Sequence, residues 1–173
     1  MAEYVKMELL LQRICHNHPN CEGCPFKGSL PSKEGCIPVT EEDFKTIEKI
    51  ALKWEQENPL PNTDLSTFKA YEEFSRRTSS PHMTHRERLV EAMLGLTGEA
   101  GECADFVKKG MYQGHNMVTA DLVNELGDVL WYLREACDAL GVPLQSIAEA
   151  NIEKLWKRYP NGFSPERSIN REE

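Results

Sequence analysis

The sequence lacks the two features that would direct a chain into or across a membrane. It contains no apolar run near the ~20 residues that a transmembrane helix requires. Its first residues, MAEYVKMELLLQRI, have neither the basic start nor the small-residue cleavage site of a signal peptide. We therefore expect no membrane partner and a cytoplasmic location.

Basic residues are also too few for a nucleic-acid-binding surface. The chain has 20 Lys and Arg against 28 Asp and Glu, a net charge of −8. No segment has the positive excess with which proteins neutralise phosphates of DNA or RNA, so we expect no nucleic-acid partner. An acidic protein that binds a polyanion needs cations between the two.

Strand patterns are absent after residue 65, where apolar residues recur at helical spacing instead. Helices are predicted over residues 1–14, 40–58, 66–77, 84–112, 119–140 and 143–158. The stretch NPLPNTD breaks the chain, so we predict a cysteine-rich N-terminal segment plus helix over 1–60 and a second domain over 61–173. Short connections predict an all-α fold, an antiparallel four-helix bundle preceded by a small cysteine-containing segment with one or two helices.

Short signals mark the ends of two predicted helices. Thr84 and Glu87 have the spacing of a capping box at the start of the 84–112 helix, and Gly114 follows its end. The tripeptide GVP after residue 140 ends the next helix, because glycine stops a helix and proline cannot continue it.

Two pairs of acidic residues lie on consecutive predicted helices, Glu99 and Glu102 in EAGE, then Glu125 and Asp128 in ELGD. Residues three apart share a helix face, and antiparallel packing would bring all four carboxylates together. The apolar neighbours of the second pair place the acids near the core, where unpaired like charges are very costly. Divalent cations remove that cost, and oxygen-only ligands favour Mg²⁺ or Mn²⁺.

Two alternatives compete with this interpretation. Acids on amphipathic helices are usually solvated, although two such pairs flanked by glycine and apolar residues are unusual. A di-iron carboxylate bundle would need Glu-x-x-His, which the sequence does not contain. Gly98, Gly101 and Gly127 directly precede three of the acids. They either let helices approach or leave room for a ligand.

Three separated blocks resemble one protein family: GLTGEAGECADFVKKGMYQGH, ELGDVLWYL and EANIEKLWKRYPNGFSPERSIN. They are similar to the MazG-like nucleoside triphosphate pyrophosphohydrolases of the all-α NTP pyrophosphatase superfamily. The resemblance extends from about Thr67 to Asn170. The family hallmark is ExxE, a spacer and ExxD, and 22 residues separate Glu102 from Glu125 here.

The resemblance implies hydrolysis of a nucleoside triphosphate, with a dNTP favoured, to the monophosphate and pyrophosphate with Mg²⁺ or Mn²⁺. It implies that Glu99, Glu102, Glu125 and Asp128 are the metal ligands. Glu99 or Glu102 would also orient or deprotonate the attacking water. Family members form oligomers, so a homodimer or homotetramer is expected.

Further residues are candidates for nucleotide binding. Lys109 and Tyr132 lie seven residues after Glu102 and Glu125 and so share their helix faces. The resemblance implies that a tyrosine after ExxD, and an asparagine and basic residues of the last helix, lie near the nucleotide. In this sequence they are Tyr132, Asn151, Lys154 and Arg158. The alternatives are solvated cations and, for Tyr132, a core aromatic.

Four cysteines lie outside the resemblance, with the spacing C-x5-C-x2-C-x11-C: Cys15, Cys21, Cys24 and Cys36. In a cytosolic chain such a cluster favours structural Zn²⁺ or an iron–sulfur cluster, and His16 or His18 can replace one ligand. Free thiols and disulfides are the alternatives.

Two functions therefore fit the sequence. The first is a metal-dependent nucleoside triphosphate pyrophosphohydrolase. The second is a non-catalytic nucleotide-binding or regulatory module with a metal-binding N-terminal docking segment. Ordinary dNTPs, modified nucleotides and alarmone-type nucleotides are all compatible with the first.

Overall fold

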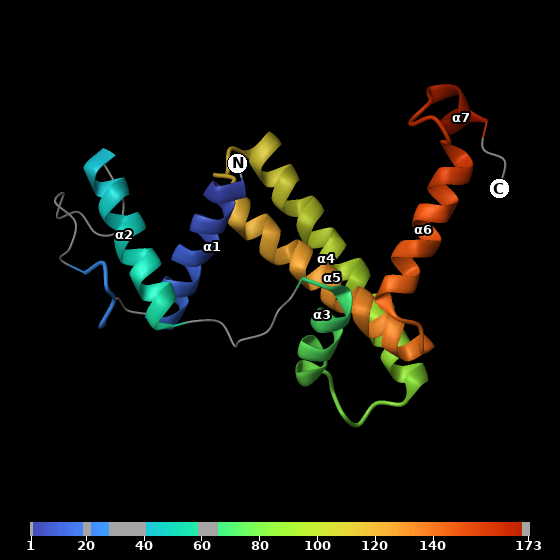
Figure 1. Cartoon of the computed structure of the whole chain (residues 1–173), viewed down its shortest axis with the longest axis horizontal. Coiled ribbons are helices and arrows are strands. Elements are labelled where there is room, and N and C mark those ends of the chain that lie inside the picture. Colours follow the sequence, from blue (N-terminus) through green and yellow to red (C-terminus); the bar gives the residue numbers. More distant parts are fainter. Residues whose placement is uncertain (1, 19–21, 28–40, 59–65, 171–173) are drawn as a thin grey trace. The chain divides into compact units, whose positions relative to one another are not determined.

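A computed structural model describes residues 2–18, 22–27, 41–58 and 66–170. These residues form helices and no strand, so the predicted all-α class is confirmed (Figure 1). The elements are α1 (Ala2–Asn17), α2 (Glu41–Glu57), α3 (Phe68–Ser75), the 3-10 helix η1 (Arg76–Thr78), α4 (His85–Gln113), α5 (Thr119–Leu140), α6 (Leu144–Arg158) and α7 (Pro165–Ile169). Within those ranges, no helix combines enough length with enough apolar character to traverse a bilayer.

The local signals in the sequence correctly mark the ends of α4 and α5. The Glu87 carboxylate accepts a hydrogen bond from the Thr84 backbone at 2.9 Å, and the Glu87 backbone donates to the Thr84 hydroxyl at 3.3 Å. This reciprocal pair is the predicted capping box. Gly114 and Gly141 follow α4 and α5 with φ of +73° and +67°, a backbone conformation that only glycine adopts readily.

Packing divides the chain into two compact units, of which the first comprises Met1–Thr63 and Asp105–Asn124. Its core lies between α1, α2 and residues 22–27. The buried members are Leu10, Ile14, Cys24, Phe26, Ile47, Ala51 and Trp54. Polar contacts join α1 to the first turn of α5, where the Glu8 carboxylate accepts from the Ala120 N–H at 3.2 Å. Glu8 thus satisfies one of the donors that a helix start leaves without an internal partner.

The second unit comprises Asp64–Ala104 and Glu125–Glu173. In it, α3 meets the start of α6, where the buried Glu72 carboxylate accepts from the Leu144 N–H at 2.9 Å. A negative charge at this end is favourable, because the helix dipole is positive there. Glu72 therefore fixes the direction in which α6 begins.

A buried ionic network holds residues 75–88 against α5 in the second unit. Arg134 and Glu135 have side-chain exposures of 0% and 1% and pair at 2.5 Å. Glu135 also accepts hydrogen bonds from Ser79 and Arg88. Burial alone would raise the pKa of Glu135, but its three donors hold that pKa below the ordinary value. The network is satisfied on the carboxylate side and fixes the turn that precedes α4.

The predicted division into 1–60 and 61–173 stays a prediction. One boundary of the packing units, between Thr63 and Asp64, falls between α2 and α3, whereas the other two cut through α4 and α5. The helix α7 was not predicted.

Candidate active site

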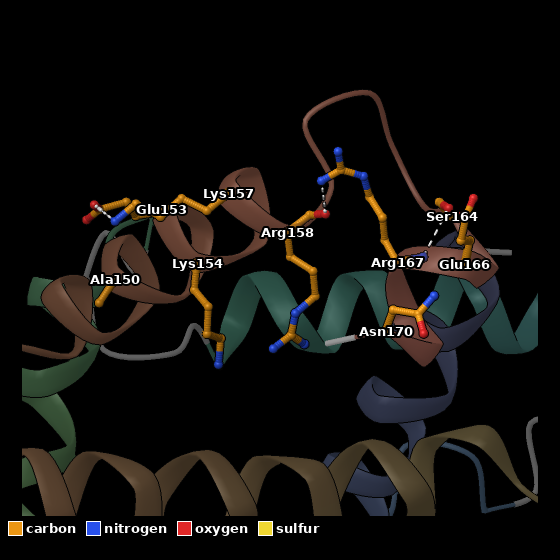
Figure 2. Close-up of a pocket in the computed structure, with 9 residues that line it drawn as sticks. All are labelled: Ala150, Glu153, Lys154, Lys157, Arg158, Ser164, Glu166, Arg167 and Asn170. Carbon is orange, nitrogen blue, oxygen red and sulfur yellow. Dashed lines mark hydrogen bonds and ion pairs between the residues drawn. The ribbon is translucent and has the colours of Figure 1, made fainter. Parts of the chain in front are cut away.

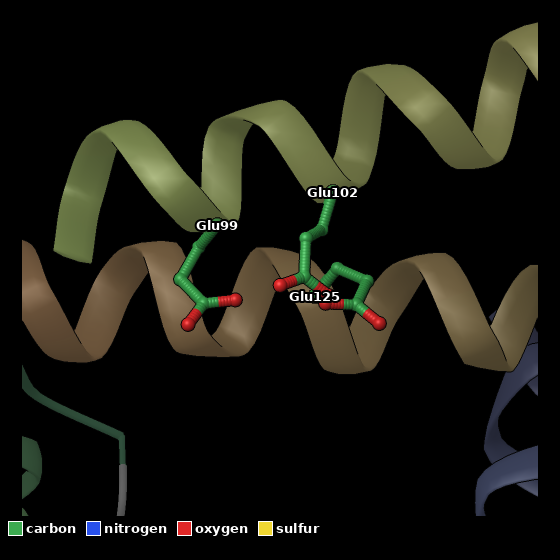
Figure 3. A group of neighbouring side chains, drawn as sticks. All are labelled: Glu99, Glu102 and Glu125. Carbon is green, nitrogen blue, oxygen red and sulfur yellow. The ribbon is translucent and has the colours of Figure 1, made fainter.

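Three of the four predicted acids come together on the facing sides of α4 and α5 (Figure 3). One carboxylate oxygen each of Glu99, Glu102 and Glu125 lies within 4.8 Å of the other two. Glu99 and Glu125 are half-buried, and Glu102 is exposed. The spacing of three residues on α4 places Glu99 and Glu102 one turn apart on one face, and α5 supplies Glu125 opposite them.

Asp128 does not belong to this group of oxygens, but it acts on it electrostatically. Partial burial raises the pKa of Glu99, and the negative charges of Glu102, Asp128 and Glu125 raise it further. All four acids therefore share one negative site. Without a cation they repel one another.

The site fits a hard divalent cation. Two oxygens bound to one Mg²⁺ at its usual ~2.1 Å can be at most ~4.2 Å apart. The three oxygens, with separations up to 4.8 Å, need only small side-chain rotations to reach this geometry. No nitrogen or sulfur ligand belongs to the group within the described ranges. The ligand set therefore suits Mg²⁺ or Mn²⁺ better than Zn²⁺ or iron.

The glycines beside these acids do not serve close helix contact. A Cβ at Gly98, Gly101 or Gly127 would meet no described atom within 4 Å. Of the two interpretations left open by the sequence, room for a ligand is therefore the one that the geometry favours. Gly95 is different, because a Cβ there would lie 2.1 Å from Tyr132 Cε1. Only a residue without a side chain lets α4 accommodate that ring.

Tyr132 lies beside the acidic site. Its pKa is raised by burial and by the negative charges of Glu99, Glu91 and Asp128. Its ring also borders a cavity of about 530 Å³ with Val90, Leu94 and Gly95. The role of Tyr132 in nucleotide binding stays a prediction, and Gly95, which makes room for its ring, is a residue that the sequence did not reveal.

Lys109 belongs to the first packing unit, although it lies on the same helix as Glu99 and Glu102. Its ammonium pairs with the Asp105 carboxylate at 2.5 Å. Hydrogen bonds from Lys108 and Lys109 lower the pKa of Asp105 to about 2. Its role in nucleotide binding stays a prediction.

The three predicted residues of α6 divide into two groups. Asn151 is exposed. Lys154 and Arg158 line a cavity of about 1040 Å³ together with residues of α7 (Figure 2). The sequence did carry a signal for α7, since Ser164 before Pro165 is a favourable helix start, and the Ser164 hydroxyl accepts from the Arg167 N–H at 3.3 Å.

The predicted cysteine site is only partly described. Cys15 is exposed, and Cys24 is buried in the core of the first unit. Cys21 and Cys36 lie outside the described residues. Whether these four residues bind Zn²⁺ or an iron–sulfur cluster stays a prediction.

Comparisons with known proteins agree with this site. The family model for the MazG nucleotide pyrophosphohydrolase domain matches residues 88–163, which include all four acids. The chain is 37% identical over 89 residues to "Gene 37 protein" of Mycobacterium phage L5, an alignment that covers 49% of this chain and 78% of that protein. No solved structure matches the chain. The chain belongs to the MazG nucleotide pyrophosphohydrolase family.

Proposed function

We propose that this protein hydrolyses a nucleoside triphosphate, with a dNTP as the favoured substrate, to the monophosphate and pyrophosphate in a Mg²⁺-dependent reaction. The observation that carries the proposal is the convergence of Glu99, Glu102 and Glu125 within the region that matches the family. Oxygen ligands of this kind, beside open space at Gly98 and Gly101, suit a site where a metal and a phosphate group meet.

The proposed reaction assigns a role to each acid. Glu99, Glu102, Glu125 and Asp128 hold Mg²⁺, for which Mn²⁺ is a substitute. A bound divalent ion supplies positive charge that neutralises the triphosphate and the charge that develops as it is cleaved. Glu99 or Glu102 orients a water for attack on the α-phosphorus and accepts its proton. The bond from the α-phosphorus to the bridging oxygen breaks, and pyrophosphate leaves.

The nucleotide-binding residues complete the proposal. Tyr132 and the cavity of Val90 and Leu94 offer an apolar surface for the nucleoside beside the acidic site. Lys109, Asn151, Lys154 and Arg158 keep the roles that the family resemblance implies.

We include in the proposal a homodimer or homotetramer with α3 to α6 arranged as a four-helix bundle. Exposed apolar residues support this part. On α6, Ile152 is 53% exposed and Trp156 is 64% exposed. A second copy of the chain would cover such residues.

The N-terminal cysteines form a separate part of the proposal. Cys15, Cys21, Cys24 and Cys36 would hold a structural Zn²⁺ or an iron–sulfur cluster and so form a docking segment. Metal analysis of the purified full chain, compared with a variant in which all four are serine, tests this. Equal zinc and iron contents in the two proteins would refute it.

Two substitutions test the reaction itself. Glu102→Gln and Asp128→Asn should abolish pyrophosphate release while the helical circular dichroism signal is kept. Glu149→Gln, an exposed acid on α6 outside the site, is the matched control and should keep full turnover. If either site variant retains full activity, the metal assignment is wrong. Nucleotide binding without pyrophosphate release by the wild type would instead support the regulatory module.

A further inference from the structure

Helix α1 lies outside the region that matches the family, yet it contacts the helix that carries two of the four acids. The matched region begins at residue 88, whereas α1 ends at Asn17. The Gln12 side-chain amide donates to the Asp121 carboxylate, and the Asn124 amide donates to the Gln12 side-chain oxygen at 2.9 Å. A single glutamine therefore bridges two residues at the beginning of α5, from 109 and 112 positions away in the chain.

A second contact, one turn earlier on α1, reinforces this bridge. The Glu8 carboxylate accepts from the Ala120 N–H, and Ala120 is fully buried. Glu8 and Gln12 are four residues apart and so lie on one face of α1. Both helix segments belong to the first packing unit, which includes Met1–Thr63 and Asp105–Asn124. One face of α1 therefore holds the start of α5 through two side chains.

The two bridged residues are neighbours of the metal ligands along α5. Asn124 is bonded directly to Glu125, and α5 continues through both residues without a break. Asp121 precedes Glu125 by four residues and Asp128 by seven. At ~3.6 residues per turn, these three acids lie on nearly the same side of the helix. The turn of α5 that Gln12 holds is therefore the turn from which Glu125 extends to the acidic site.

We propose that Gln12 is a positioning residue for the metal site, because its bonds to Asp121 and Asn124 fix the turn of α5 that presents Glu125. Metal affinity depends on the groups that orient the ligands, and loss of a group bonded directly to a ligand lowers it roughly 10–100-fold. Gln12 bonds the neighbours of Glu125, so its loss should cost less, about three- to tenfold. This role rests on the proposed function, since it takes the acidic site to hold a divalent cation.

Binding of Mn²⁺ alone to the full chain, followed by electron paramagnetic resonance without nucleotide, tests this role without turnover. Gln12→Ala should weaken Mn²⁺ binding about three- to tenfold, and alanine keeps α1 helical. Gln145→Ala is the matched control, because it removes an exposed glutamine that bonds only within α6, and it should bind Mn²⁺ as the wild type does. In turnover, Gln12→Ala should raise the Mg²⁺ concentration needed for half-maximal rate by the same factor. Its KM for the triphosphate at saturating Mg²⁺ should be unchanged.

Exchanging the two partners separates positioning from a general loss of stability. In Gln12→Glu/Asp121→Asn, the amide at position 121 can donate to the carboxylate at position 12, which also accepts from Asn124. The net charge is unchanged, so Mn²⁺ affinity should return to the wild-type value. Wild-type affinity in Gln12→Ala, even with a lowered Tm, would overturn the proposal, as would a double variant that binds no better than Gln12→Ala. Those results would leave the proposed function intact, whereas a wild type that binds no Mn²⁺ would refute the metal site and the role of Gln12 together.

Discussion

The contact between Gly95 and Tyr132 predicts opposite effects for two alanine substitutions on the same helix. Replacing a glycine inside a helix by alanine stabilises it by ~1 kcal/mol. Gly98→Ala should gain this, because its Cβ would meet nothing within 4 Å among the described atoms. Gly95→Ala would place a Cβ 2.1 Å from Tyr132 Cε1 and 2.3 Å from Cζ, so the ring must move. Overpacking of this kind costs ~1–3 kcal/mol.

The helix-propensity gain is common to both variants, so their difference isolates the clash. Gly95→Ala should be less stable than Gly98→Ala by about 1–3 kcal/mol. For a chain of this size that corresponds to roughly 2–12 °C in Tm. Thermal and urea unfolding followed by circular dichroism at 222 nm measure it. In a Tyr132→Ala background the difference should disappear, since the ring is gone. Equal stabilities of the two alanine variants in the wild-type background would refute the contact.

Other predictions concern the buried ionic network around Glu135 and the acidic site on α4 and α5. Glu135→Gln should destabilise the fold by about 3–5 kcal/mol, because it removes the carboxylate that buried Arg134 shares with Arg88 and leaves Arg134 with Asp138 at 3.3 Å. Loss of the exposed Lys157–Glu153 pair by Lys157→Ala should change stability far less. Similar losses would contradict the buried network. Because the folded-state pKa of Glu135 lies below its ordinary 4.5, its contribution is complete above that value and is lost as pH falls through the lowered pKa. Stability of the wild type should therefore fall below about pH 4.5, more steeply than that of Glu135→Gln, and parallel pH curves would disprove the assignment. At the metal site, Glu125→Gln should raise the Tm of the metal-free protein by relieving repulsion and should abolish the Mg²⁺-dependent rise in Tm; a full Mg²⁺ response in this variant would exclude Glu125 as a ligand.

Local patterns explain why most of the fold was predictable. Apolar residues at helical spacing, the Thr84–Glu87 capping box and the glycines after α4 and α5 act within a few residues of chain. The three-residue spacing in EAGE likewise follows from helix geometry, so the convergence of Glu99 and Glu102 needs no long-range information.

Features that depend on packing between elements were not predictable in this way. Arg134 follows an apolar stretch of α5, and nothing nearby in sequence shows that Ser79, 55 positions from Arg134, and Arg88, 47 positions from Glu135, complete this network. The role of Gly95 depends on a ring from another helix.

Isotope labelling tests the central claim most directly, since it reports which phosphorus is attacked. The wild type is incubated with a panel of ribo- and deoxynucleoside triphosphates and Mg²⁺ in H₂¹⁸O, with Glu102→Gln as the control. We predict one pyrophosphate released per monophosphate, ¹⁸O in the monophosphate alone, and no product from the control. Label in the pyrophosphate, release of orthophosphate, or undiminished product from Glu102→Gln would contradict the account.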